Sequence, residues 1–200
     1  VAAMMTRSLT TYGGDMAVGA FGISNRLILF IVMVVIGLNQ GMQPIAGFNF
    51  GARHYDRVLG VLRIALIVGT IITLSGFIVG TFFARPCVSL FAKDAPELVD
   101  MAAHALSCFV MMFPIVGIQI VSTAFFQSIG YAKKSIFLSL TRQLIFLVPA
   151  IFILPHVFAD PLEGLWYAGP IADAMASVLA ITLLIKQVKK FKQGQIPNGG

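Results

Sequence analysis

Long apolar runs separated by short polar turns dominate the pattern of this chain. A membrane-spanning helix needs about 20 mostly apolar residues, so most of these runs are long enough to cross a bilayer. The pattern predicts the end of one helix at residues 1–9 and then five complete spans, at residues 16–50, 58–84, 101–129, 136–154 and 165–185. Each run is helical in period or uniformly apolar, and none alternates as the strands of a membrane barrel do. The sequence therefore predicts an all-α, polytopic bundle of membrane helices.

The second run is unusual because it is too long for a simple span. A helix over residues 16–50 would extend roughly 50 Å, whereas the hydrocarbon layer is about 30 Å thick. We therefore expect this helix either to protrude from the membrane or to break between Gly37 and Pro44. Pro44 has no N–H for the carbonyl of Gln40, which makes it a candidate hinge. A static packing kink is the alternative interpretation. The preceding turn, Thr10–Asp15, contains two adjacent glycines.

Composition supports a membrane protein. Hydrophobic residues make up 58% of the 200 residues and charged residues only 11%, against about 25% charged residues in soluble domains. The chain opens at Val1 within the apolar pattern, so we expect it to be a piece of a longer protein. Cys87 and Cys108 are too few for a disulfide framework, and we expect them to behave as small buried hydrophobes.

The charges are distributed unevenly between the two sides of the predicted bundle. One set of loops contains Arg53, Arg57, Arg63, Lys133, Lys134, Lys186, Lys189, Lys190 and Lys192, and the other set contains only Arg7, Arg85 and Lys93 as basic residues. The positive-inside rule predicts that the first set, including the C-terminal end, is cytoplasmic. The net charge of +6 is thus a topology signal, and we expect no nucleic-acid partner. We expect a membrane lobe at residues 1–189 and a basic, disordered tail at 190–200.

Polar side chains within the spans indicate a solute pathway. At about 100° per residue, Asn25, Asn39 and Gln43 share one face of their helix over roughly 27 Å. Gln119 lies near the middle of the 101–129 span, and Gln143 lies in the next span. We predict that these five side chains line a lumen. Interhelical hydrogen bonding is the alternative, because it also places polar groups inside a bundle.

Two charged residues also lie within the predicted spans. Asp173 is the only carboxylate well inside a span, and a carboxylate there is a candidate site for ion coupling. We expect it within two turns of the external end, near Trp166 and Tyr167, which we predict to be interfacial anchors. Arg142 is expected about 10 Å from the cytoplasmic end, from where it can extend to the interface. These positions predict no direct ion pair between Arg142 and Asp173.

The sequence contains no recognisable catalytic motif. His54, His104 and His156 lack metal-ligand spacing, and we find neither a nucleophile–base set nor a phosphate-binding loop. We therefore predict no enzyme activity, no metal site and no cofactor beyond a coupling ion.

Three motifs give the chain a family resemblance. The stretch GMQPIAGFNFGARHYDRV at residues 41–58 resembles the loop after the eighth helix of the multidrug and toxic compound extrusion (MATE) transporters. FFQSIGYAKKS at 125–135, followed by TRQLIFLVPAIFILP at 141–155, resembles their tenth-to-eleventh helix segment. GLWYAGPIAD at 164–173 resembles the start of their twelfth helix. The resemblance implies two six-helix lobes, of which this chain is the second, with helix seven truncated.

The resemblance also implies a function. It predicts a multi-pass protein of the bacterial inner membrane that exports organic cations or drugs in exchange for Na⁺ or H⁺. The N-terminal lobe would be its partner within the same protein. Some family branches place a coupling carboxylate where this chain has Gln119, so coupling is expected in the first lobe, as in DNA-damage-inducible relatives. Asn25 falls near a substrate-contacting position of some relatives.

One alternative keeps the fold and changes the cargo. Lipid-linked oligosaccharide flippases belong to the same superfamily and usually have lumen cations for an anionic diphosphate head group. Arg26 and Arg142 are the only intramembrane arginines here, so the charge pattern favours drug efflux. A purely structural membrane subunit is a further possibility that the sequence leaves open.

Overall fold

The computed structural model describes residues 1–92 and 95–193, and every secondary-structure element in them is helical. In chain order the elements are α1 (Ala2–Gly51), α2 (Tyr55–Phe82), α3 (Ala84–Ser89), α4 (Pro96–Val110), α5 (Phe113–Ser128), α6 (Ala132–Leu140), the π-helix η1 (Thr141–Leu147), α7 (Val148–Val157) and α8 (Pro161–Lys192). Four helices are long and apolar enough to cross a membrane, or five if the bent pair α4 and α5 counts as one span. This confirms the predicted all-α membrane bundle.

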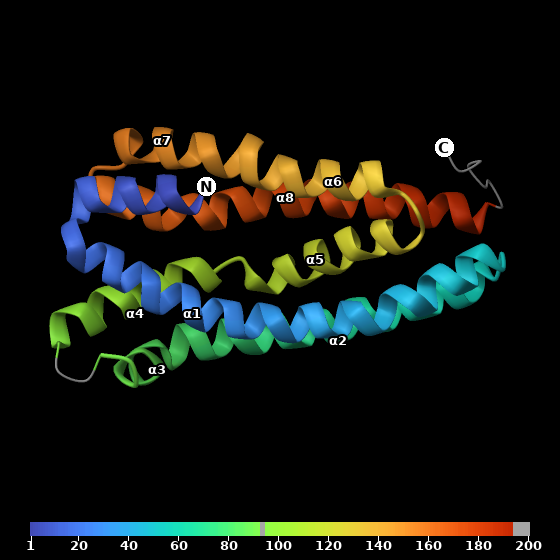
Figure 1. Cartoon of the computed structure of the whole chain (residues 1–200), viewed down its shortest axis with the longest axis horizontal. Coiled ribbons are helices and arrows are strands. Elements are labelled where there is room, and N and C mark those ends of the chain that lie inside the picture. Colours follow the sequence, from blue (N-terminus) through green and yellow to red (C-terminus); the bar gives the residue numbers. More distant parts are fainter. Residues whose placement is uncertain (93–94, 194–200) are drawn as a thin grey trace.

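Helix α1 consists of two segments that meet at Gly14. This residue has φ 65° and ψ −163°, a backbone conformation that glycine adopts without a steric penalty. The N-terminal segment runs alongside α8, and the chain then turns into the long second segment (Figure 1). The break lies in the Thr10–Asp15 turn, as predicted. No break occurs between Gly37 and Pro44, because the backbone stays helical there. Protrusion of this helix from the membrane and a hinge at Pro44 remain predictions.

The span predicted at residues 101–129 is divided into two helices. Helices α4 and α5 meet at a bend of 56°. Pro114 lies in the first turn of α5, where its missing N–H needs no intrahelical partner. The residues on both sides of the bend are apolar, so hydropathy alone could not reveal it.

Helices α6, η1 and α7 together form one span, residues 132–157. Its middle, Thr141–Leu147, is π-helical. Pro149 follows just after this stretch and cannot donate a backbone hydrogen bond, which is a common cause of such irregularity. A π-helical turn changes the direction of the side chains that it carries, here including Arg142 and Gln143. The helix also continues past Pro155 to Val157.

Aromatic contacts join the basic loops at one end of the bundle. Phe191 stacks on Tyr55 with ring centroids 5.5 Å apart, and Phe50 meets Tyr131 at 6.1 Å. The loops of the first basic set therefore lie at the same end, and the assignment of that end to the cytoplasm remains a prediction. Because Phe191 is buried, α8 continues to Lys192. The expected tail is thus helical at 190–192, and its residues 194–200, like Lys93, lie outside the described residues.

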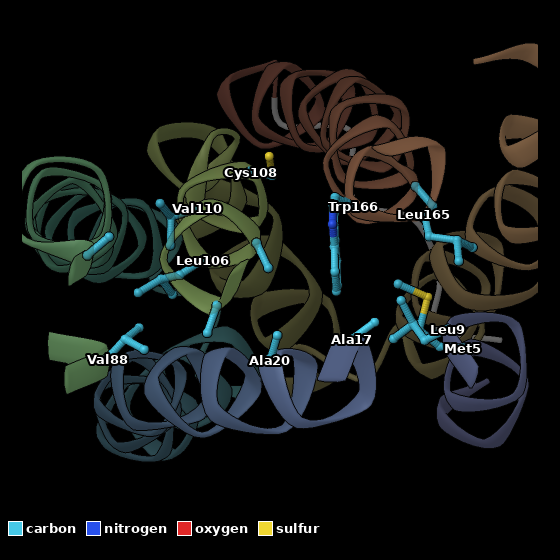
Figure 2. Close-up of a cluster of buried hydrophobic side chains, with 14 of the residues drawn as sticks. Met5, Leu9, Ala17, Ala20, Val88, Leu106, Cys108, Val110, Leu165 and Trp166 are labelled. Atoms are coloured by element: carbon cyan, nitrogen blue, oxygen red, sulfur yellow. The ribbon is translucent and has the colours of Figure 1, made fainter. Parts of the chain in front are cut away.

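Trp166 belongs to the hydrophobic core. It is 1% exposed and meets Phe109 edge-on with ring centroids 5.7 Å apart. Figure 2 shows its indole between α8 and the helices on the opposite side of the cluster. Trp166 therefore packs inside the bundle instead of facing lipid, five residues after the start of α8 at Pro161, and its depth in the membrane stays a prediction. Cys108 is buried in the same cluster, as predicted, whereas Cys87 is only half-buried.

The crossing of α2 and α5 depends on small residues. A Cβ atom on Gly117 would lie 2.5 Å from Thr73 Oγ1 and 2.9 Å from the carbonyl oxygen of Gly69. We expect Gly117→Ala to reduce the free energy of unfolding by about 1–3 kcal/mol, because backbone atoms would have to move. Thermal unfolding in detergent measures this effect. Gly41→Ala is the control, because its Cβ would have no neighbour within 4 Å. Equal melting temperatures for the two variants would contradict the close crossing.

Candidate functional site: a polar cavity in the helix bundle

A polar cavity of about 480 Å³ lies between α1, α5 and the α6–η1 segment. Its wall consists of Val32, Ile36, Asn39, Gln40, Gln43, Gln119, Ile120, Thr123, Ala124, Gln127, Ser139, Arg142 and Gln143. Four of the five predicted lumen residues, Asn39, Gln43, Gln119 and Gln143, are therefore brought together on one wall. Side chains that are far apart in the sequence converge here because three helices border the same cavity. Asn39 and Gln119 are buried, Gln43 is half-buried and Gln143 is exposed.

A second, smaller cavity of about 160 Å³ contains the fifth predicted residue, Asn25. Asp173 also lines it, together with aromatic side chains that include Phe21 and Phe109. Val32, Ile120 and Arg142 line both cavities. Asn25 is thus separated from the other amides, and Arg142 lies at the boundary between the two cavities.

Two amides of the larger cavity are deeply buried without strong partners. Asn39 is 5% exposed, and its Oδ1 has no hydrogen-bond partner among the described residues. Gln119 is 4% exposed, and its Oε1 accepts only a long hydrogen bond, 3.5 Å, from Ser177 on α8. Buried polar atoms usually have good partners because their desolvation is costly. The two amides therefore border the cavity with hydrogen-bonding capacity that the described residues leave largely unused, although Asn39 Oδ1 is itself enclosed by protein atoms.

An ion pair joins the α6–η1–α7 span to α8. Arg142 Nε donates to Asp173 Oδ1 over 2.6 Å. The prediction that these residues do not pair was wrong. Asp173 lies 12 residues after Pro161, and Arg142 lies 15 residues before Val157, so both are about 20 Å from the same end of the bundle. The two helices begin and end further out than the sequence indicated, which places both charges at a similar depth. Arg142 consequently does not extend to the interface.

This pair determines the electrostatic character of the site. Among the residues that line the two cavities, Arg142 and Asp173 carry the only charges. Because they neutralise each other, the wall has no net charge, and its remaining polar groups are amides and hydroxyls. The site can therefore donate and accept hydrogen bonds without imposing a strong field of one sign.

Sequence reasoning missed part of the wall. Thr123 and Gln127 lie four and eight residues after Gln119, a spacing that keeps all three on one helical face. This periodicity could have identified them. Periodicity could not identify Arg142, because the direction of its side chain depends on the π-helical turn and on the contact with Asp173.

Apolar helices that surround an amide-lined cavity define a polytopic membrane protein with an internal polar site, and comparison with known proteins identifies its family. The MatE family profile matches residues 1–153, more than half of the chain. The chain therefore belongs to the MatE family, the multidrug and toxic compound extrusion transporters.

Individual relatives agree with this assignment. The multidrug export protein MepA of Staphylococcus haemolyticus (strain JCSC1435) is 24% identical over 176 residues, covering 88% of this chain and 38% of the relative. MepA of Staphylococcus aureus (strain MSSA476) is 25% identical over 174 residues, covering 86% of this chain and 37% of the relative. The chain thus spans less than two fifths of the length of these relatives.

Solved structures show the same fold. The MATE multidrug transporter DinF-BH, solved as a complex, has a TM-score of 0.77 and 36% identity, covering 89% of this chain and 39% of that chain. An inward-facing multidrug resistance MATE family transporter of the MOP superfamily has a TM-score of 0.87 and 19% identity, covering 96% of this chain and 44% of that chain. The similarity to this inward-facing transporter shows a shared fold and nothing further.

Proposed function

We propose that this chain forms one lobe of a secondary active antiporter that exports organic cations in exchange for Na⁺ or H⁺. The observation that carries this proposal is the amide-lined cavity between α1, α5 and η1, whose one charged lining residue, Arg142, is paired with Asp173. The Oδ1 atom of Asn39 is buried without a partner among the described residues, and a flip of the amide group would present this acceptor to an N–H group of a bound cation. Apolar neighbours such as Val32, Ile36 and Ile120 suit the hydrocarbon part of such a ligand.

The pathway would be completed by an N-terminal lobe. The chain covers 38% of the first relative, which leaves room for a second bundle that encloses the open side of the cavity. Antiport would then proceed by rocking of the two lobes about the binding site. We place the assembly in the bacterial inner membrane with the basic end of the bundle in the cytoplasm.

Asp173 remains the candidate ion-coupling group of this lobe, with one restriction. Its Oδ1 already accepts a hydrogen bond from Arg142. A coupling Na⁺ or proton would therefore compete with the guanidinium for this carboxylate and weaken the ion pair during the cycle. The chain resembles family branches whose coupling aspartates lie in the first lobe. This resemblance supports a second coupling site in that lobe.

The flippase alternative fits the cavity less well. A diphosphate head group requires unpaired cations, and Arg142 is the only basic residue among those that line the two cavities. Its Nε is held by Asp173. Arg26, the other intramembrane arginine, lines neither cavity. The neutral wall thus favours an organic cation over an anionic lipid.

Flux measurements in vesicles test the exchange. The complete transporter, with both lobes, would be reconstituted in liposomes that contain a fluorescent organic cation. We expect efflux of the cation to accelerate when an inward gradient of H⁺ or Na⁺ is imposed and to slow when an ionophore dissipates that gradient. Efflux that ignores both gradients would exclude antiport.

A further inference from the structure

Three potential metal ligands converge far from the basic end of the bundle. His104 Nε2 lies 2.7 Å from Glu163 Oε1 and 3.7 Å from the sulfur of Cys108. One ligand atom from each residue lies within 4.8 Å of the other two. His104 and Cys108 are four residues apart on α4, on one helical face, whereas Glu163 comes from the first turn of α8. The sequence prediction of no metal site considered spacing along the chain and could not include this third residue.

The distances suit a zinc ion. With bond lengths of about 2.0–2.3 Å and tetrahedral angles, nitrogen, oxygen and sulfur ligands of one zinc ion lie roughly 3.4–3.6 Å apart. The observed separation of 3.7 Å between His104 Nε2 and Cys108 Sγ already matches this value. The separation of 2.7 Å between His104 and Glu163 needs to widen by less than about 1 Å, which a rotation of the Glu163 side chain provides.

The donor types select the kind of metal. A thiolate and an imidazole favour zinc and neighbouring transition metals, whereas Mg²⁺ and Ca²⁺ prefer oxygen ligands alone. Cys108 is 5% exposed, and Figure 2 shows its sulfur pointing toward α8. The side chains of His104 and Glu163 are 49% and 35% exposed. A metal ion can therefore enter from solvent and meet a buried thiol at the base of the site.

We propose that His104, Cys108 and Glu163 bind Zn²⁺, with solvent in the fourth position, and that the ion cross-links α4 to α8. Both helices line the smaller cavity, α4 through Phe109 and α8 through Gly169 and Asp173. The bound ion would hold the two helices together at the end of the bundle where α8 begins. This site lies outside the proposed transport cavity, and its existence does not depend on the transported solute.

Metal titration of the purified protein in detergent tests this proposal. Co²⁺ is the spectroscopic probe, because a cobalt ion bound to a thiolate has a ligand-to-metal charge-transfer band in the near ultraviolet. We expect this band with wild-type protein, at a stoichiometry of one ion per chain, and its reversal by Zn²⁺. Cys108→Ser should remove the band. His104→Asn and Glu163→Gln should weaken Zn²⁺ binding by at least about tenfold.

Matched controls separate this site from other metal-binding groups. Cys87→Ser removes the other cysteine, and His156→Asn removes a histidine outside the cluster, so both should bind Co²⁺ as wild type does. Circular dichroism would show that each variant retains its helices. The proposal is overturned if the wild-type protein gives no charge-transfer band, or if the band persists in Cys108→Ser.

Discussion

Arg142→Gln is expected to reduce the free energy of unfolding by about 2–3 kcal/mol and to abolish transport. The substitution leaves the Asp173 carboxylate buried without its partner, and removing one member of a buried ion pair costs more than the pair contributes. The Asp173 side chain is 10% exposed, whereas the Arg142 side chain is 37% exposed. Solvent therefore screens part of the interaction, so the expected cost lies below that of a fully buried pair. Thermal unfolding in detergent and vesicle flux measure the two effects.

The reciprocal substitution provides a control. Asp173→Asn leaves Arg142 without its carboxylate, but the more exposed guanidinium can reach water, so we expect a smaller loss of stability. In the double variant Arg142→Gln/Asp173→Asn, two neutral amides replace the pair. We expect its melting temperature to lie above that of Arg142→Gln alone. The interaction would be contradicted if the two single substitutions lowered the melting temperature equally and if the double variant showed the sum of the two decreases.

Asn39→Leu is expected to stabilise the fold and to impair transport. The buried Oδ1 of Asn39 has no partner among the described residues, so replacing the amide with an apolar side chain of similar size removes a desolvation cost of about 1–3 kcal/mol. The same change removes a hydrogen-bond acceptor from the cavity wall. We expect a rise in melting temperature together with a fall in cation efflux of about tenfold, which corresponds to roughly one hydrogen bond to a charged ligand.

Asn49→Leu is the matched control for this prediction. Asn49 is on the same helix and is also buried, but it lines neither cavity, and its Nδ2 donates to the carbonyl oxygen of Ile45 over 2.8 Å. Its replacement should leave efflux unchanged and should not raise the melting temperature. An Asn39→Leu variant that transports at the wild-type rate would remove this residue from the proposed site.

Much of the cavity could be predicted because it follows from helical periodicity. Asn39 and Gln43 are four residues apart, so any helix over this stretch presents both on one face. Gln119 and Gln143 were polar residues in apolar spans, where desolvation directs such groups toward a bundle interior. Asn25 was also on the predicted face, yet it lines the smaller cavity, because a polar face that spans the membrane need not border a single cavity.

The contacts between helices could not be read from the sequence. The Arg142–Asp173 pair depends on the ends of two helices, and an error of a few residues in each end moves a side chain by several ångströms. The cluster of His104, Cys108 and Glu163 depends on how α4 packs against α8. The burial of Trp166 depends on the same packing, because its ring meets Phe109 of α4.

The binding position of the exported cation tests the central claim most directly. A structure of the complete transporter, determined by electron cryomicroscopy with a bound organic cation, would show this position. We predict ligand density between α1, α5 and η1, within hydrogen-bond distance of Asn39 or Gln119. Ligand density confined to the N-terminal lobe, with these amides free of ligand, would contradict the claim that this cavity is the binding site.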